Sequence, residues 1–268
     1  MSNWKSEFLE EWKRRDQTAD QKKSLFPLIE HTFDEDDILA MAEVILSGQL
    51  TMNEWVRRFE RKFAERVGAP FAVMVNSGSS ANLLAVAAAV NPLRPNHLRG
   101  GDEVLVPAVC WPTSVWPILQ LGLRPVFVDV DPKSLNVDLK DLRSKIGSRT
   151  RGLMSVHILG NSAPMDELKE IVERHRLLWI EDTCESLGSL AFGKTLGSFG
   201  EFGTYSFYYS HHITTGEGGM VVCRTQEDSD LLRCLRAHGW TRELSNRQQV
   251  EQAHPDIDSR FCFVNAGF

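Results

Sequence analysis

Seven short apolar runs alternate with amphipathic stretches along the middle of the chain, and this alternation restricts the fold more than any other feature. The runs cover residues 71–75, 103–108, 125–130, 152–157, 177–182, 204–209 and 219–223. Helical patterns lie near residues 79–90, 112–120, 138–146, 165–175 and 227–237. Short strands separated by helices predict βαβ units and a mostly parallel α/β sheet that is buried on both faces. The loop between the last two runs is too short for a long helix, which predicts that part of the sheet is antiparallel.

Aromatic side chains mark two helices ahead of these runs. Trp4, Phe8 and Trp12 recur at four-residue spacing, which places them on one face of a helix within residues 1–25. A second stripe predicts a helix that ends at Gly68, a residue suited to a helix C-terminus. The members of this stripe are Trp55, Phe59, Phe63 and Val67.

Composition excludes several classes of protein. The 268 residues include 30 Lys and Arg against 36 Asp and Glu, a net charge of −6, and there is no basic stripe, which argues against a nucleic-acid partner. No apolar run approaches the roughly 20 residues of a membrane span, and the N-terminus is too charged for a signal peptide. Five cysteines without a CxxC pair indicate free thiols in a reducing compartment, so we expect a cytoplasmic protein.

The first candidate site follows the run 71–75. In open α/β sheets, ligands bind beyond the carboxyl ends of the parallel strands. Gly78, Ser79 and Ser80 stand there, in the segment NSGSSAN that leads into a helix. Such a helix start can bind a phosphate group. It can also be an ordinary N-cap made by a serine.

The second candidate site closes the run 177–182. Glu181 and Asp182 end an apolar strand, so at least one carboxylate lies where a ligand would bind. A carboxylate there can hold the protonated nitrogen of a heterocycle, or it can cap the next turn. We interpret Cys184 as a small buried residue, since no charge pattern favours its thiolate.

The third candidate site is the segment SFYYSHHITTGEGGMVV. It predicts Ser206 and Tyr208 within a strand and His211 and His212 at the exit of that strand. Adjacent histidines point in different directions and have no third ligand at a usual spacing, so we expect no metal site. A single histidine at the mouth of a strand can serve as a general acid or base, or it can be structural.

Four segments together resemble the sugar-modifying, DegT/DnrJ/EryC1-type branch of the fold-type I pyridoxal-phosphate (PLP) enzymes, in the aspartate aminotransferase superfamily. The segments are NSGSSAN, PAVCWPTS, EDTCESLGS and SFYYSHHITTGEGGMVV, and the resemblance runs from about residue 30 to the end. It implies the three-layer αβα fold of that group, with a seven-stranded sheet.

The resemblance also implies roles for individual residues. Gly78, Ser79 and Ser80 would bind the cofactor phosphate, with Ser206 adding a hydroxyl group. Trp111 would stack on the pyridine ring. Asp182 would pair with the pyridine nitrogen, and Glu185 would support that site. Tyr208, His238 and Arg242 are weaker candidates for substrate contacts.

The departure from this pattern is His211, which stands where the sugar aminotransferases have their Schiff-base lysine. The segment 204–223 contains no lysine, and the nearest one upstream is Lys194. Without that amine the cofactor cannot be held covalently. A histidine there resembles the 3-dehydratases of nucleotide-linked 4-keto-6-deoxy sugars, which use the pyridoxamine form (PMP).

Among these dehydratases, the resemblance favours those acting on GDP-4-keto-6-deoxy-D-mannose in colitose and O-antigen biosynthesis. The iron–sulfur enzymes acting on CDP-linked sugars have clustered cysteines, but no cysteine lies between Cys234 and Cys262, so we expect no iron–sulfur cluster. CDP or TDP as the nucleotide carrier stays open. A PLP-dependent nucleotide-sugar aminotransferase and a non-catalytic nucleotide-sugar-binding relative are the alternative functions.

The resemblance implies L-glutamate as amino donor, a proton carried by His211, and a homodimer with shared active sites. It also implies three regions. Residues 1–30 would form an N-terminal helical segment, 31–240 the large cofactor-binding domain, and 241–268 the start of a small C-terminal domain. Because the apolar string RFCFVNAGF stops without a closing helix, we expect that small domain to be largely missing.

Overall fold

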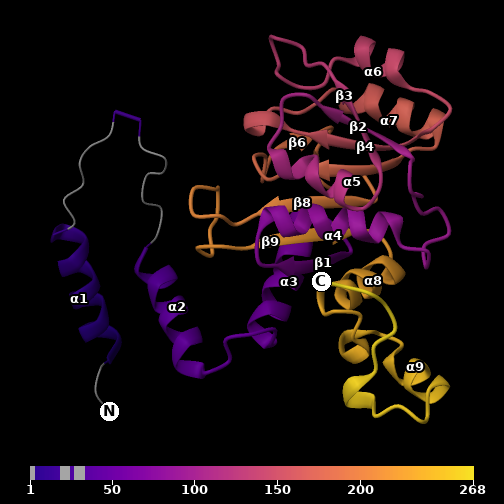
Figure 1. Ribbon diagram of the computed structural model, residues 1–268. Coiled ribbons are helices and arrows are strands. Elements are labelled where there is room, and N and C mark those ends of the chain that lie inside the picture. The colour runs from indigo at the N-terminus through magenta and orange to yellow at the C-terminus, as the bar shows by residue number, and fades with distance from the viewer. Residues whose placement is uncertain (1–3, 19–24, 27–33) are drawn as a thin grey trace. The chain divides into compact units, whose positions relative to one another are not determined.

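The computed structural model describes residues 4–18, 25, 26 and 34–268, and the chain divides into two compact units, Met1–Phe59 and Glu60–Phe268. Figure 1 shows the elements of both. Residues 1–3, 19–24 and 27–30 of the expected N-terminal segment lie outside the described residues. The domain boundaries expected near residues 30 and 240 stay predictions.

The first unit is helical, and helices and strands alternate through the second unit. In chain order the helices are α1 (Trp4–Thr18), α2 (Glu35–Ser47), α3 (Glu54–Val67), α4 (Gly78–Val90), α5 (Trp116–Gln120), α6 (Leu139–Lys145), α7 (Met165–His175), α8 (Gln226–Arg236) and α9 (Arg247–Ala253). The strands are β1 (Phe71–Val75), β2 (Glu103–Pro107), β3 (Arg124–Val128), β4 (Thr150–Val156), β5 (Leu178–Asp182), β6 (Leu190–Ala191), β7 (Lys194–Thr195), β8 (Phe202–Ser206) and β9 (Gly219–Cys223).

The aromatic stripes correspond to helices, as predicted. Trp4 and Phe8 lie on α1 with ring centroids 6.3 Å apart. Helix α3 carries the second stripe and ends before Gly68, whose φ of 69° is the left-handed geometry that glycine allows. Helix α2 was not predicted, although the sequence carries its signal: Asp34 and Asp37 form a reciprocal capping box at its start.

The main sheet has seven strands in the order β1-β9-β8-β5-β4-β2-β3. Strands β3, β2, β4, β5 and β8 are parallel, whereas β9 pairs antiparallel with both β8 and β1. This confirms a mostly parallel sheet with an antiparallel part.

One strand boundary differs from the prediction. Strand β8 ends at Ser206, so the placement of Tyr208 within a strand is wrong. The backbone N–H of Tyr208 donates to Ser206 Oγ at 3.3 Å, and this local bond takes the place of a ladder bond beyond Phe207. The apolar run continues past the point where the sheet stops.

Helices cover both faces of the sheet, as the three-layer αβα fold requires. Helices α4, α5 and α8 pack on one face through a core that includes Val86, Ile118 and Leu232. Helices α6 and α7 pack on the other face through Leu142 and Leu168, and Figure 1 shows both helices beside β2, β3 and β4. The sheet is therefore buried on both sides, and its polar groups must find partners inside the protein.

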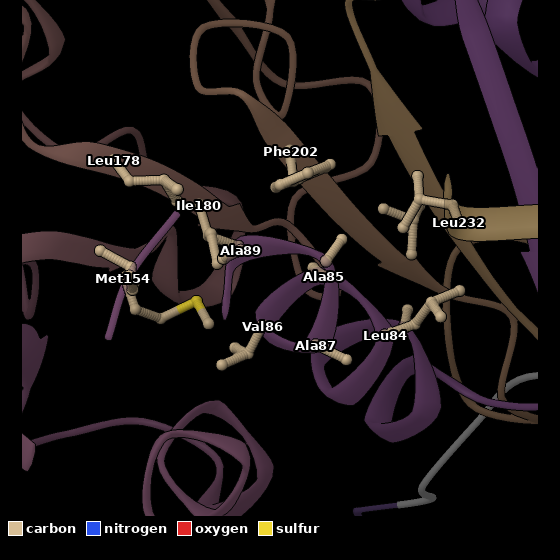
Figure 2. Close-up of a cluster of buried hydrophobic side chains, with 14 of the residues drawn as sticks. Leu84, Ala85, Val86, Ala87, Ala89, Met154, Leu178, Ile180, Phe202 and Leu232 are labelled. Carbon is tan, nitrogen blue, oxygen red and sulfur yellow. The ribbon is translucent and has the colours of Figure 1, made fainter. Parts of the chain in front are cut away.

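The alternation of side chains along β5 decides which face of the sheet each of its residues points toward. Leu178 and Ile180 point toward the α4 face, where Figure 2 shows them near Ala89 and Phe202. Trp179 belongs to the core under α7. Successive side chains of a strand point to opposite faces, so Asp182 continues the α4 side and Glu181 the α7 side.

No helix among the described residues is long and apolar enough to cross a membrane.

Candidate active site

Asp182 is the centre of a polar cluster at the carboxyl end of β5. Its side chain is buried. Oδ2 accepts hydrogen bonds from Asn82 Nδ2 at 2.8 Å and from Ser114 Oγ at 2.7 Å. Oδ1 accepts from the backbone N–H of Cys184 at 3.1 Å. Three donors fix the carboxylate, and because its two oxygens offer about four acceptor positions, one remains for a ligand donor.

Helix α4 supplies the donor that is farthest away in sequence. Asn82 is a buried amide in a helix that is otherwise rich in alanine. Its Oδ1 accepts from the Thr204 hydroxyl at 2.6 Å, which leaves its NH₂ group to donate to Asp182. Thr204 lies on β8, two residues before Ser206 and on the same face.

Glu181 has a different role from Asp182, although the two are adjacent. Its carboxylate is fully buried and accepts from the backbone N–H groups of Gly197, Phe199 and Gly200 at 3.0, 2.6 and 2.7 Å. His157 Nε2 lies 3.2 Å from the same carboxylate. Glu181 thus anchors the loop 197–200, and Asp182 is the carboxylate that faces the candidate site.

The start of α4 has the geometry of an anion site. Ser77 is the N-cap, and its Oγ accepts from the backbone N–H of Ser80 at 3.0 Å. The N–H groups of Gly78 and Ser79 precede the first intrahelical bond, from Ala81 to Ser77, so α4 itself offers them no acceptor. Ser77 therefore caps the helix through Ser80, and the N–H groups of Gly78 and Ser79 are still available to bind an anion.

Ser206 lies against this helix start. A Cβ atom on Gly78 would come within 2.6 Å of Ser206 Cβ and 2.9 Å of Cys184 Sγ. Only glycine lets the α4 backbone approach β8 this closely. Gly78, Ser206 and Asp182 thus belong to one region, although Gly78 and Ser206 are far apart in the sequence.

The segment between β2 and α5 forms another wall. Ser114 donates to Asp182, and the Thr113 hydroxyl is 3.1 Å from Ser79 Oγ. Trp111, three residues before Ser114, is 67% exposed. An indole this accessible beside the cluster is available to stack on a flat ligand.

His211 lies in the connection between β8 and β9 and is half-buried. Its backbone N–H donates to Tyr208 O at 3.0 Å, and its ring meets the Tyr208 ring edge-on at 6.0 Å. Its Nδ1 is buried and has no hydrogen-bond partner among the described residues. An unpartnered ring nitrogen is suited to accept or donate a proton. In the part of the chain that the structure describes, no three His, Cys, Asp or Glu residues are grouped to hold a metal ion.

The remaining candidates are less closely tied to the cluster. Glu185 accepts the backbone N–H of Leu159 at 2.8 Å, so it holds the loop after β4. Tyr208 is exposed and follows Ser206. His238 and Arg242 are exposed beyond the end of α8, and Arg242 lies over the Trp240 ring at 5.3 Å. Within the described residues, neither His238 nor Arg242 bonds to Asp182 or His211.

Lys194 does not replace the missing amine. Its Nζ donates to Ser198 O at 2.7 Å and lies 4.7 Å from the Phe199 ring centroid. It lines a hollow with Glu201, which precedes β8, and with Arg224, which follows β9, and so it lies at the edge of the sheet opposite Asp182.

Two of the cysteines are affected by burial and by the charge of Asp182. All five are free. Burial and then the charge of Asp182 raise the pKa of Cys110 to about 11, and the same two causes raise the pKa of Cys184 well above its ordinary value. Both thiols stay protonated near neutral pH. The raised pKa agrees with the prediction that Cys184 is not a nucleophile, whereas its expected burial is only partial in the structure. The charge of Asp182 also favours a ligand cation nearby.

Sequence reasoning missed Asn82, Ser114 and Thr204, which hold Asp182 in place. Asn82 carries a signal, since a polar residue on the buried side of an alanine-rich helix needs a buried partner. Ser114 and Thr204 carry none, because their roles depend on contacts across 68 and 122 residues.

Three similar proteins are 3-dehydratases. The chain is 41% identical over 245 residues to the GDP-4-keto-6-deoxy-D-mannose 3-dehydratase of Escherichia coli O55:H7, covering 91% of this chain and 63% of that protein. It is 42% identical to the enzyme of the same name from Yersinia pseudotuberculosis, and the match covers 91% of this chain and 62% of that protein. It is 43% identical to the dTDP-4-dehydro-2,6-dideoxy-D-glucose 3-dehydratase of Saccharopolyspora spinosa, and the match covers 88% of this chain and 53% of that protein. The chain therefore spans less than two thirds of the length of each.

Solved structures lead to the same group. The E. coli GDP-4-keto-6-deoxy-D-mannose-3-dehydratase with bound hydrated PLP matches at 40% identity and a TM-score of 0.85, over 91% of this chain and 63% of that one. A GDP-4-keto-6-deoxymannose-3-dehydratase with a trapped PLP–glutamate geminal diamine matches at 39% identity and a TM-score of 0.85. The match again covers 91% of this chain and 63% of that one. Residues 31–266 match a single family, and with this fold and cluster the chain belongs to the DegT/DnrJ/EryC1/StrS aminotransferase family.

Proposed function

We propose that the chain belongs to a PLP- and PMP-dependent 3-dehydratase that removes the 3-hydroxyl group of a nucleotide-linked 4-keto-6-deoxy sugar, with L-glutamate as amino donor. We take GDP-4-keto-6-deoxy-D-mannose as the substrate, in the biosynthesis of a 3,6-dideoxy sugar. The observation that carries the proposal is the imidazole of His211, with an unpartnered Nδ1, in a segment without lysine.

The residues around Asp182 fit a phosphorylated pyridine cofactor. The N–H groups of Gly78 and Ser79 at the start of α4 would bind the phosphate group, with the Ser206 hydroxyl nearby. The remaining acceptor position on Asp182 would receive the pyridine N–H. Trp111 would cover one face of the ring. When bound, the cofactor would supply an amino group and an electron sink.

His211 is the residue that we propose moves the proton. An imidazole can take a proton and return it in a proton-transfer reaction. It would remove a proton from the methylene carbon of the pyridoxamine form of the cofactor and then assist the departure of the substrate's 3-hydroxyl group as water. A lysine there would bind the cofactor covalently instead.

The atoms balance when glutamate is included. The sugar loses its 3-hydroxyl group and gains hydrogen at carbon 3, which is a two-electron reduction. L-Glutamate is oxidised to 2-oxoglutarate and ammonia, which accounts for the two electrons. The sugar product is therefore one oxygen atom lighter than the substrate.

Mass spectrometry of the products tests this function. The purified protein would be incubated with PLP, L-glutamate and GDP-4-keto-6-deoxy-D-mannose. We expect 2-oxoglutarate, ammonia and a sugar lighter by one oxygen atom. A stable amino sugar would instead establish an aminotransferase, the first alternative. Saturable binding of the sugar without either product would favour the non-catalytic binding relative.

A second readout does not depend on turnover. Borohydride fixes a cofactor that is bound to lysine, and we expect no such covalent product from this chain. His211→Lys would create one and would lose the dehydration. His212→Lys, at the adjacent exposed position, is the matched control and should give no fixed cofactor.

The expected homodimer and the nucleotide carrier belong to the same proposal. The exposed apolar side chains of Val109, Trp111, Trp116 and Leu119 lie next to the cluster, which supports a partner subunit near the site. Light scattering measures the oligomeric state. Parallel assays with GDP- and TDP-linked sugars decide the carrier, which the similarity to both classes of relative leaves open.

A further inference from the structure

A second cleft lies at the opposite edge of the sheet from Asp182. Its volume is about 610 Å³. It is lined at the amino ends of β4 and β5 by Arg151 and Leu178, and beyond the end of β9 by Arg224. Because Asp182 closes the carboxyl end of β5, the cleft and the candidate active site are on opposite edges. A ligand in one does not compete with a ligand in the other.

The lining is strongly basic, and we call this cleft the arginine cleft. Its basic side chains are Arg94, His97, Arg151, Lys169, Arg176 and Arg224. Only two acidic side chains, Glu173 and Glu201, line it as well. The chain as a whole carries a net charge of −6, so this gathering of positive charge is local and opposes the overall balance.

The two acidic groups neutralise only part of the positive charge of the cleft, since within the described part of the chain Glu173 forms an ion pair with Lys169 alone. Glu201 Oε2 accepts the backbone N–H of Trp179 at 2.7 Å, and Glu173 lies 3.8 Å from Lys169. Arg151 donates to the carbonyl of Thr150, and among the described residues neither Arg151 nor Arg176 has a carboxylate partner. Both are exposed at the cleft.

Two other guanidinium groups are held rigidly in the wall. Arg94 pairs with Asp228 through Nε at 2.6 Å and Nη2 at 3.2 Å, and it lies over the Phe202 ring at 4.9 Å. Its Nη1 is buried without a partner among the described residues. Arg224 donates to the carbonyl groups of Ser198 and Phe199. Fixed guanidinium groups lose little conformational entropy when an anion binds.

The positive charge of the cleft also affects the pKa of a neighbouring lysine, Lys194. Lys194 lines the adjoining hollow, which shares Glu201 and Arg224 with the arginine cleft. Burial lowers the pKa of Lys194 most, and the charge of Arg224 lowers it further. Glu181 opposes this with a smaller effect than that of Arg224, and Lys169 adds the smallest lowering effect. Like charges that depress one another in this way favour the binding of an anion between them.

We propose that the arginine cleft binds the diphosphate group of a small molecule. Arginine forks match phosphate oxygens, and two linked phosphates can meet cations that come from several separate elements. The volume is in the range of sites for small ligands and exceeds what one phosphate ion fills. The inference does not rest on the proposed function, since it uses other residues at the other edge of the sheet.

Calorimetric titration with inorganic pyrophosphate tests the proposal. The titration would be done at constant ionic strength, because salt screens exposed charges, and with PLP present so that the start of α4 is not the binding site. We expect saturable binding that weakens at least tenfold in Lys169→Gln/Arg176→Gln. Lys140→Gln/Arg174→Gln removes the same charge from exposed positions outside the cleft and should bind as the parent does.

The outcomes separate the sources of the ligand. Tighter binding of ADP than of pyrophosphate, lost in the same double variant, would identify a nucleoside diphosphate site. Equal binding would identify a site for the free diphosphate. Absence of saturable binding at 1 mM pyrophosphate, about the weakest range for a specific site, or equal weakening in both double variants would overturn the proposal. Circular dichroism of each variant checks that its fold is intact.

Discussion

The side-chain amide of Asn82 donates a hydrogen bond of 2.8 Å to Oδ2 of Asp182 across 100 residues of sequence. The Thr204 hydroxyl fixes the amide from the other side, at 2.6 Å from Asn82 Oδ1. Helix α4 and strands β5 and β8 thus meet in one chain of buried bonds. Because all three residues are buried, the orientation of the carboxylate is set before any ligand arrives.

We predict that Asn82→Leu weakens cofactor binding. The leucine has a similar volume but cannot donate, so Asp182 loses one of its three fixed donors. A lost hydrogen bond to a charged group corresponds to about 1.5–3 kcal/mol, or roughly a ten- to hundredfold rise in Kd. Equilibrium dialysis with PLP measures it, and Asn246→Leu, at an exposed position, is the control. An unchanged Kd would mean that Ser114 and Cys184 suffice to orient Asp182.

We predict that Trp111→Ala also weakens cofactor binding but barely changes stability. The side chain is 67% exposed, so its loss from the unliganded protein should change the free energy of unfolding by no more than about 0.5 kcal/mol. The stacking contact with the ring should be worth about 1 kcal/mol, or roughly a fivefold change in Kd. Urea unfolding and PLP titration separate the two effects. A large fall in stability with normal binding would make Trp111 structural.

Glu181→Gln should destabilise the fold. The backbone N–H of Ala163 donates to His157 Nδ1 at 3.2 Å, so His157 Nε2 carries the proton and donates to Glu181. With three backbone donors as well, the carboxylate satisfies four groups, and an amide would turn its own N–H bonds toward some of them. We expect a loss of about 3 kcal/mol in the free energy of unfolding. Glu170→Gln, on the exposed side of α7, should change it little; similar losses in both would refute the role of Glu181.

Alkaline pH should destabilise the protein through its buried thiols. Burial and then the charge of Asp228 raise the pKa of Cys223 from 9.0 to about 12. Above pH 9 the unfolded chain releases this proton while the native protein keeps it, so stability falls as pH rises toward 12. The slope is about 1.4 kcal/mol per pH unit for one such group.

Replacing Cys223 by alanine isolates this contribution. The free energy of unfolding of Cys223→Ala, measured by urea titration between pH 8 and 11, should depend less steeply on pH than that of the parent. The substitution lowers stability at every pH because it removes buried volume. The test therefore concerns the slope, and equal slopes would show that Cys223 does not titrate differently in the two states.

The sequence was informative where structure depends on local pattern. Strands of the sheet and helix α3 could be predicted because apolar spacing reflects burial directly. Tyr208 was misplaced because an aromatic residue favours a strand wherever it stands, whereas the strand ends where Ser206 Oγ takes the next N–H. Helix α2 was missed because its cap lies beside a weakly patterned segment.

The residues of the candidate site also include some that could be predicted from the sequence and some that could not. Gly78 and the pair Glu181 and Asp182 were candidates from their positions at strand ends, whereas the choice of Asp182 and the role of Ser206 came from the family resemblance. The structure brings Gly78, Asp182 and Ser206 together around α4. Ser114 and Thr204 could not be found, because a serine or threonine carries no local mark of a partner that lies tens of residues away. The role proposed for His211 rests on the family resemblance together with the absence of lysine from its segment, and both can be read from the sequence.

The adjacency of Glu181 and Asp182 limits how β5 can change. Their opposite orientations follow from the two-residue period of a strand, so inserting one residue in β5 ahead of Glu181 would turn each side chain to the opposite face. The loop 197–200 would then lose its carboxylate anchor, and the site beside α4 would receive a longer side chain in place of Asp182. For protein engineering, β5 is therefore a segment in which substitutions are feasible but changes of length remove the stability and the site together.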